Sequence, residues 1–223
     1  MVVVLGHATI DERGKATGGK AGDNNGKEVC RRNWYKHSKG WNVLRAKDAA
    51  TAEKIAKCME MACDNNNIGY NQHKRNTLYN AAAGYGFDVS KVGTKVDTDC
   101  SALVRVCLAY AGIKVADFIT SNEKKILLAT GLFTELNIGG SSDYLKRGDI
   151  LITKTKGHTV VVLSDGEKVG AANRTYTVKS GDSLWKIAKN ELGKGLRYTE
   201  IKKLNGMKTN TIYAGQVLKL PDK

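Results

Sequence analysis

The sequence predicts an α+β protein in which helices in the first half of the chain precede an antiparallel sheet. Apolar residues recur at helical spacing over residues 47–64. Two β-rich runs occupy residues 150–153 and 159–163, and Lys156–Gly157 between them is a turn sequence. Helical spacing followed by a hairpin favours helices packed on one antiparallel sheet.

Further helices are expected over residues 73–83, 100–111 and 122–130. Gly112 follows one of them and suits the position after a helix end, where a left-handed backbone is common. Residues 1–46 are rich in Gly, Lys, Asn and Asp, and they predict loops and short extended pieces.

Length and composition describe a globular chain. The 223 residues are long enough to bury a core. Apolar residues make up 41% and charged residues 26%, which excludes a largely disordered or membrane-spanning chain. The apolar run at residues 2–5 lacks the basic flank and the length of a signal peptide, so none is predicted. Five cysteines, an odd number in a chain of this size, argue against a disulfide framework.

The charge balance predicts a polyanionic partner. The chain has 36 Lys and Arg against 22 Asp and Glu, a net charge of +14. Nucleic acid, anionic lipid and wall teichoic acids all fit such a charge. The sequence has no helix-turn-helix or zinc-finger spacing, and its basic residues are scattered, which disfavours specific nucleic-acid binding. His7, His37 and His73 show no metal spacing, so no catalytic metal and no cofactor are expected.

Cys100 is the candidate nucleophile. It follows Asp99, a residue type that caps helices, and precedes an apolar helical run, so it should lie in the first helical turn. There the helix dipole and free N–H groups favour a thiolate, the nucleophilic form of cysteine. The alternative interpretation is a small buried hydrophobe. His158, at the mouth of the predicted hairpin, is the candidate general base, and its alternative is a histidine satisfied within the fold.

Three sequence blocks carry a family resemblance. They are Asp-Cys-Ser-Ala-Leu-Val at 99–104, Gly-Asp-Ile-Leu at 148–151 and Gly-His-Thr-Val-Val-Val at 157–162. In this order they resemble the papain-like peptidoglycan hydrolases of the NlpC and CHAP superfamily, over about residues 65–173. The resemblance implies a papain-like domain with Cys100 as nucleophile and His158 as general base.

The third polar residue of that family is less clearly marked. A histidine usually follows the base by about a dozen residues, which falls near Gly170 here. The nearest polar candidates are Asp165, Glu167 and Asn173, of which we favour Asp165. Tyr70, in the pair Gly69–Tyr70, resembles a tyrosine that the family places near the acyl oxyanion; packing is the alternative role. Segments from Gly6–Thr9 to Trp34–Tyr35 also resemble phage and prophage endolysins of Gram-positive hosts.

Residues 175–221 resemble a LysM domain. The matching marks include the opening Tyr-Thr-Val-Lys, Gly-Asp-Ser-Leu-Trp at 181–185, Leu-Asn-Gly at 204–206 and the closing Leu-Lys-Leu-Pro. The resemblance implies a βααβ fold that binds N-acetylglucosamine-containing chains such as peptidoglycan. It places the sugar groove between the loop after residue 181 and the loop at 210–214, with these binding residues: Gly181, Asp182, Ser183, Leu184 and Ile212.

The sequence therefore predicts a peptidoglycan hydrolase with a catalytic domain at 1–173 and a wall-binding domain at 174–223. It would be made in the bacterial cytoplasm without a signal peptide and act on the wall after release. The partners would be the glycan and stem peptide, with anionic wall polymers as a further partner. The amide bond that is cut stays open, and the alternative function is non-catalytic binding by a degenerate hydrolase domain.

Overall fold

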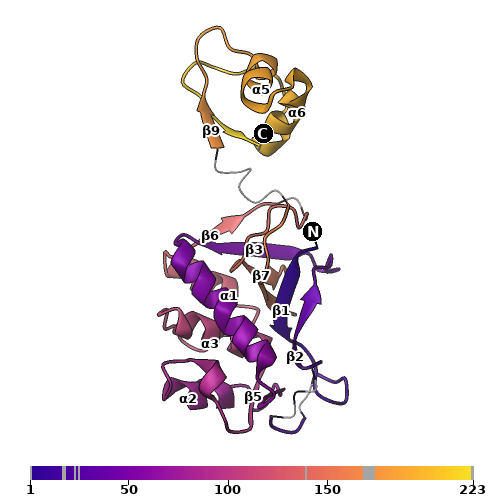
Figure 1. The fold of residues 1–223 in the computed structure, drawn as a ribbon, viewed down its shortest axis with the longest axis vertical. Coiled ribbons are helices and arrows are strands. Elements are labelled where there is room, and N and C mark those ends of the chain that lie inside the picture. The colour runs from indigo at the N-terminus through magenta and orange to yellow at the C-terminus, as the bar shows by residue number, and fades with distance from the viewer. Residues whose placement is uncertain are drawn as a thin grey trace. The chain divides into compact units, whose positions relative to one another are not determined.

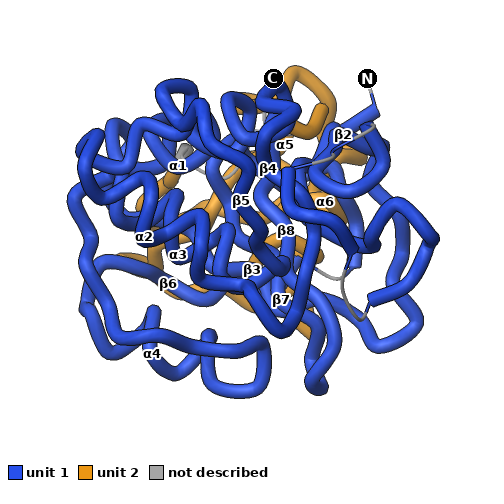
Figure 2. The backbone as a smooth tube through the Cα atoms, turned by 90° about the horizontal axis from the view of Figure 1, so that it is seen from below, with its two compact units in different colours: residues 1–165 blue, residues 166–223 orange. Residues whose placement is uncertain are grey.

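A computed structural model describes the chain as two compact units, residues 1–165 and 166–223 (Figures 1 and 2). Each unit is treated by itself. The predicted boundary at 173/174 borders residues 168–173, which lie outside the described part. The described residues are 2–16, 19–22, 24, 26–138, 140–167 and 174–221.

Unit 1 is built on a six-stranded antiparallel sheet in the order β2-β1-β8-β7-β3-β6. The N-terminal strand lies inside the sheet, between β2 and β8. The strands are β1 (Val4–Ala8), β2 (Val29–Asn33), β3 (Trp41–Ala46), β6 (Phe133–Leu136), β7 (Ile150–Thr153) and β8 (Thr159–Val162).

Three of these six strands come from residues 1–46, where the sequence predicted loops and short extended pieces. β1 pairs with β8, with Leu5 opposite Val162, although some 150 residues separate them in the chain. β2 lies at the sheet edge, and Arg31 and Arg32 on it are exposed, so it shows no apolar alternation. Pairing over this distance leaves no local sequence pattern, which explains the difference.

Two helices, α1 (Ala49–Asp64) and α3 (Cys100–Tyr110), pack on each other and against strands of the sheet (Figure 1). Asp48 caps α1 by accepting a hydrogen bond from the Thr51 N–H at 2.7 Å. The buried apolar faces of both helices form the main core with residues of the sheet. The predicted helices at 47–64 and 100–111 are therefore confirmed.

Five shorter elements complete unit 1. α2 (Thr77–Ala83) and α4 (Glu123–Ala129) confirm the two other predicted helices, although α2 begins four residues late. β4 (Ile68–Tyr70) and β5 (Val96–Thr98) form a separate parallel pair in which Tyr70 lies opposite Thr98. A short 3-10 helix, η1, covers Val89–Lys91.

The Gly-Asp-Ile-Leu block fixes the start of β7. Gly148 has φ +87°, and a Cβ there would lie 2.3 Å from the carbonyl oxygen of Ala52, so only glycine fits. The carboxylate of Asp149 is buried and accepts two hydrogen bonds from Arg45, at 2.7 and 2.6 Å. This block therefore anchors the strand that leads to the His158 hairpin.

Unit 2 has the predicted βααβ order. It comprises β9 (Arg174–Thr177), α5 (Leu184–Leu192), the 3-10 helix η2 (Gly195–Arg197), α6 (Tyr198–Leu204) and β10 (Val217–Leu220), and β9 pairs antiparallel with β10. Its own small core includes Leu184, Ile187, Ile201 and Leu218. The α+β class is confirmed for the chain. Across the described residues, no helix has the length and apolar character needed to cross a bilayer.

Candidate active site

Cys100 is the first residue of α3, as predicted. Asp99 adopts an extended backbone and caps the helix, accepting a hydrogen bond from the Ala102 N–H at 2.7 Å. Its other carboxylate oxygen accepts one from Arg75 Nε at 2.6 Å. Arg75 also binds Asp117 and the Ser101 hydroxyl, so the helix start is held by a branched polar network.

The sulfur of Cys100 contacts the beginning of β8. The backbone N–H of Thr159 donates a hydrogen bond to it, and the N–H of Ser101 lies close enough to favour its charged form as well. Because His158 immediately precedes Thr159, the fold brings the predicted nucleophile and the predicted base to neighbouring positions. The described hydrogen bonds include none between the Cys100 sulfur and the His158 ring; such bonds commonly tighten only when substrate is bound.

Burial dominates the acidity of the thiol. Cys100 is 7% exposed. Its removal from water, followed by the negative charges of Asp99 and Glu123, raises the pKa of the thiol to about 12. The expectation that the helix N-terminus lowers this pKa is therefore wrong, because desolvation outweighs the two N–H contacts. The resting site holds a neutral thiol.

His158 is hydrogen-bonded to a second histidine. Its Nε2 lies 2.8 Å from Nδ1 of His7, and the rings meet edge to face with centroids 5.0 Å apart. The register of β1 and β8 explains this contact, since Gly6 lies opposite Val161 and the next residue of β1 is His7, so continuing the register brings His7 diagonal to His158. Among the described residues, no hydrogen bond engages the Nδ1 atom of His158.

Both rings are neutral at ordinary pH. Burial, then the neighbouring His158 and Arg32, lowers the pKa of His7 to about 3. Burial, then His37 and Arg32, lowers the pKa of His158 to about 4, against an opposing effect of Asp99. A neutral His158 is the form that accepts a proton, so the pair suits a general base with an orienting partner.

The structure does not bring Asp165 to this pair. Its carboxylate accepts the Arg147 N–H at 2.7 Å, beyond the far end of β8 from His158. Six residues separate the two in the chain, and the four of them in β8 alone span about 13 Å at the usual rise of a strand. Glu167 lies two residues farther along, and Asn173 lies outside the described residues. His7 thus occupies the place beside the base that Asp165 was expected to fill.

Tyr70 lies close to the nucleophile. It is 2% exposed, and a hydrogen bond from Gln72 Nε2 reaches its hydroxyl at 3.1 Å. Burial, then the electrostatic effect of Cys100, raises the pKa of Tyr70, which keeps its hydroxyl protonated as a donor. Its backbone N–H donates to the buried carboxylate of Glu28 at 2.7 Å, which fixes β4.

Sequence reasoning missed an aromatic cluster beside the site, made of Tyr35, His37 and Trp41. Ring centroids of the three pairs lie 5.0–5.9 Å apart, and all three residues are half-buried. His37 acts electrostatically on His158, and Cys100 acts on Tyr35. The spacing of these residues in a Gly- and Lys-rich segment gave no periodic pattern; the only local clue was their aromatic type.

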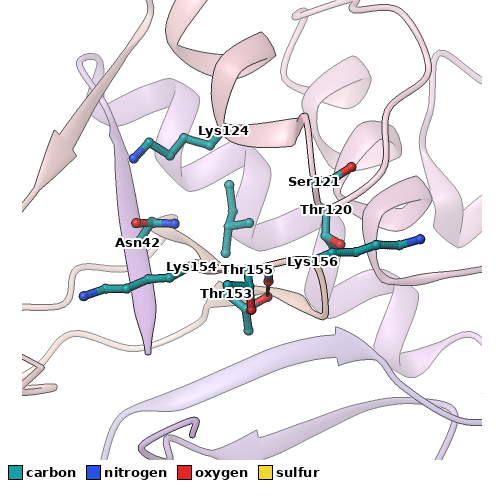
Figure 3. Close-up of a pocket in the computed structure, with 9 residues that line it drawn as sticks. Asn42, Thr120, Ser121, Lys124, Thr153, Lys154, Thr155 and Lys156 are labelled. Atoms are coloured by element: carbon teal, nitrogen blue, oxygen red, sulfur yellow. Dashed lines mark hydrogen bonds between the residues drawn. The ribbon is translucent and has the colours of Figure 1, made fainter. Parts of the chain in front are cut away.

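A polar pocket of about 210 Å³ lies against the hairpin that carries His158 (Figure 3). The Gly157 N–H donates to the Thr120 hydroxyl at 3.1 Å, so one pocket wall is tied to the hairpin tip. Figure 3 shows Lys124, Asn42 and Lys154 extending to the same side of the pocket. Its remaining lining residues are Ser121, Ile152, Thr153, Thr155 and Lys156.

In unit 2 the two loops expected to form a sugar groove leave the same end of the β9–β10 ladder, since Val178 and Gln216 are hydrogen-bonded through their backbones. Ser183 caps α5 by accepting the Lys186 N–H at 3.2 Å, and Asp182 accepts the Tyr176 hydroxyl at 2.8 Å. Of the other predicted sugar-binding residues, Gly181 has φ +84°, Leu184 is buried in the core of unit 2, and Ile212 packs against that core.

Within the ranges that the structure describes, no three His, Cys, Asp or Glu side chains are grouped to hold a metal ion. Residues 5–169 match the family described as the endolysin-like domain. The chain belongs to the endolysin-like domain family. Residues 176–221 of this endolysin-like protein match the LysM domain.

Relatives of the endolysin-like protein are named as an endopeptidase, an autolysin and an amidase. It is 59% identical over 46 residues to "Probable peptidoglycan endopeptidase LytE" of Bacillus subtilis (21% of this chain, 13% of the relative). It is 37% identical over 81 residues to "Autolysin" of Enterococcus faecalis (33% and 10%). It is 43% identical over 49 residues to "N-acetylmuramoyl-L-alanine amidase sle1" of Staphylococcus haemolyticus (22% and 14%). The chain thus spans 10–14% of the length of these relatives, and no solved structure matches it.

Proposed function

We propose that this endolysin-like protein is a peptidoglycan hydrolase that cleaves an amide bond of the stem peptide through Cys100. The observation that carries the proposal is the arrangement of three residues around one strand start. Thr159 donates its N–H to the Cys100 sulfur, while His158, the preceding residue, is bonded through Nε2 to His7. The family match and the named relatives support the substrate class.

The mechanism follows from the neutral resting state. As Cys100 attacks the amide carbonyl, Nδ1 of His158 takes the thiol proton, and His7 holds the imidazole through Nε2. Backbone N–H groups at the start of α3, together with the Tyr70 hydroxyl, stabilise the oxyanion. The imidazolium then protonates the leaving amine, the acyl-enzyme forms, and water attacks it with His158 again acting as base.

Unit 2 supplies attachment to the wall. The LysM match supports binding to the N-acetylglucosamine-containing glycan, which keeps the catalytic unit near its insoluble substrate. We extend the proposal to an NlpC- or CHAP-type subclass and to phage or prophage origin, on the sequence blocks described above. In this scheme the protein is made in the bacterial cytoplasm and reaches the wall after release.

Anionic wall polymers are a second class of partner in this proposal. The net charge of +14 attracts a polyanion. The polar pocket offers a specific place, since Lys124 and Lys154 extend to one side of it together with the amide of Asn42. Lys124 also pairs with Glu135 at 2.6 Å, so Lys154 is the stronger candidate for contact with a phosphate or carboxylate.

One observation favours the alternative, a wall-binding protein without catalysis. Cys100 is almost fully buried, and its raised pKa disfavours the thiolate. The alternative keeps the LysM function and assigns no chemistry to unit 1. Activity measurements on variants of Cys100 and of a control cysteine decide between these functions.

The test is mass spectrometry of fragments released from purified wall by the wild type, Cys100→Ala and Cys30→Ala. Cys30, a free and half-buried cysteine of β2, is the matched control. We expect release by the wild type and Cys30→Ala and none by Cys100→Ala, with the new termini identifying the amide that is cut. Equal release by folded Cys100→Ala would overturn the proposal, and no release by any protein would favour the non-catalytic alternative.

A further inference from the structure

Glu123 is a buried acid beside the candidate nucleophile. It is the first residue of α4 and has no exposed surface. One carboxyl oxygen, Oε1, accepts a hydrogen bond from the Thr159 hydroxyl at 2.8 Å. The other oxygen, Oε2, is buried and has no hydrogen-bond partner among the described residues. A buried carboxyl oxygen without a hydrogen-bond partner destabilises the fold, so its presence beside the candidate nucleophile points to a role there.

Thr159 links this acid to the sulfur. Its hydroxyl binds Glu123, and its backbone N–H binds the Cys100 sulfur. The side chain of Glu123 therefore holds Thr159 in place. Thr159 contacts the nucleophile Cys100 and directly follows the base His158 in the chain. Glu123 also exerts an electrostatic effect on Cys100 itself, which places its charge within range of the thiol.

The charged groups that act on Glu123 come from two other elements. Asp99, the cap of α3, disfavours its negative charge, and Arg75 gives a smaller opposing effect. No ion pair of Glu123 with a lysine or arginine occurs in the described part of the chain. Burial, only partly offset by the Thr159 hydrogen bond, raises the pKa of Glu123 to about 8. At neutral pH the group is therefore mainly a neutral acid.

We propose that Glu123 is a positioning residue for Cys100, which holds the start of β8 through the Thr159 hydroxyl and whose negative charge, when present, opposes formation of the thiolate. This inference rests on the proposed function for its catalytic meaning. The coupling between Glu123 and Cys100 does not itself depend on that function. A neutral acid accepts the Thr159 hydrogen bond and adds no charge near the thiolate, whereas an ionised one places two negative charges in a buried space.

The test is the rate of Cys100 alkylation by iodoacetamide between pH 6 and 10, read by peptide mass. Glu123→Gln keeps an acceptor for Thr159 and removes the charge; Glu135→Gln, at an exposed glutamate, is the matched control. For the wild type and Glu135→Gln, we expect the logarithm of the rate to rise less steeply above pH 8. Glu123→Gln should keep one slope and be faster at pH 9.5 by roughly tenfold, as expected for like charges in a partly shielded interior. Parallel profiles for all three proteins would overturn the charge coupling.

Two further measurements test the positioning role and do not depend on the rate of Cys100 alkylation, which a buried thiol can make slow. The temperature midpoint of unfolding of the wild type should fall relative to that of Glu123→Gln as pH rises from 6 to 9. The reason is that unfolding releases the proton that the folded chain retains on Glu123, and a higher pH favours this release.

Wall lysis at pH 7 should survive in Glu123→Gln and drop at least about tenfold in Glu123→Leu, which leaves the Thr159 hydroxyl without its acceptor. Parallel melting curves, or equal lysis by the two variants, would overturn the inference. If wild-type labelling bends as expected but no wall is cut, the proposed function fails and the coupling stands.

Discussion

Nδ1 of His7 and Nε2 of His158 lie 2.8 Å apart, which joins the first strand of the chain to a hairpin 151 residues later. One of the two nitrogens must carry the hydrogen and the other must accept it, so the contact selects a tautomer for each ring. With Nε2 of His158 engaged in this way, its Nδ1 is the atom left to exchange a proton with Cys100. The N-terminal strand thus contributes directly to the candidate catalytic machinery.

Replacing His7 tests this role. We predict that His7→Ala lowers the turnover of wall cleavage by about 100-fold, at the lower end of the range for general acid–base groups. The physical reason is that His158 loses the partner that fixes its tautomer and orientation. Release of fragments from purified wall at saturating wall concentration measures the effect.

Asp165→Asn is the matched control for this variant, since Asp165 was the residue expected from the sequence. Its carboxylate binds the Arg147 N–H, away from His158, so cleavage should stay close to the wild-type rate. A large loss in Asp165→Asn together with a mild one in His7→Ala would contradict the arrangement described for the site.

Acid pH should destabilise the fold through the two histidines. Their folded pKa values of about 3 and about 4 lie below the ordinary value of 6.5. Between these pKa values the unfolded chain binds more protons than the folded chain. The free energy of unfolding therefore rises with pH from about 4 to about 6.5, and this stabilisation is lost as pH falls. Thermal unfolding at a series of pH values should show a falling midpoint below pH 6.5, with a smaller fall in His7→Asn. A wild-type midpoint that is flat from pH 6.5 to 4 would show that the rings are not buried as neutral bases.

The sequence was sufficient for features that depend on local patterns. Asp99 beside Cys100 identified a helix start, because capping chemistry acts over three residues, and the structure has Asp99 accepting the Ala102 N–H. The hairpin that carries His158 was equally local. The LysM order of elements followed from motifs spread along one short segment.

Features built by distant pairing were missed. No catalytic role was predicted for His7, since nothing near it in the chain shows that β1 lies beside β8. The acidity of Cys100 was misjudged for a similar reason. The helix start is visible in the sequence, whereas burial of the thiol and the approach of Glu123 arise from packing of α4 and β8 around it.

Unit 2 should bind wall without unit 1. It has its own core, and residues 175–223 carry 10 basic and 4 acidic residues, a net charge of +6. We predict that a fragment of residues 174–223 sediments with purified peptidoglycan, whereas residues 1–173 stay mainly in the supernatant and retain cleavage of soluble wall fragments. Removal of wall polymers before the assay separates glycan binding from charge attraction. A folded fragment that stays in solution at low salt would contradict wall binding by this unit.

Lys154 should govern the salt dependence of lysis. Its ammonium group extends from the hairpin wall of the polar pocket, and a charge reversal there places a negative group where an anionic polymer would bind (Figure 3). We predict that Lys154→Glu slows lysis of intact wall about fivefold at low salt and flattens the fall in rate as salt rises, since screening then has less attraction to remove. Lys57→Glu, at an exposed lysine of α1, makes the same change in net charge and is the control. If both variants slow lysis equally, the attraction belongs to the whole charged surface and the pocket has no special part in it. If only Lys154→Glu slows lysis, the assay is repeated on walls stripped of phosphate polymers. Loss of the difference between the variants on such walls would identify phosphate as the group bound.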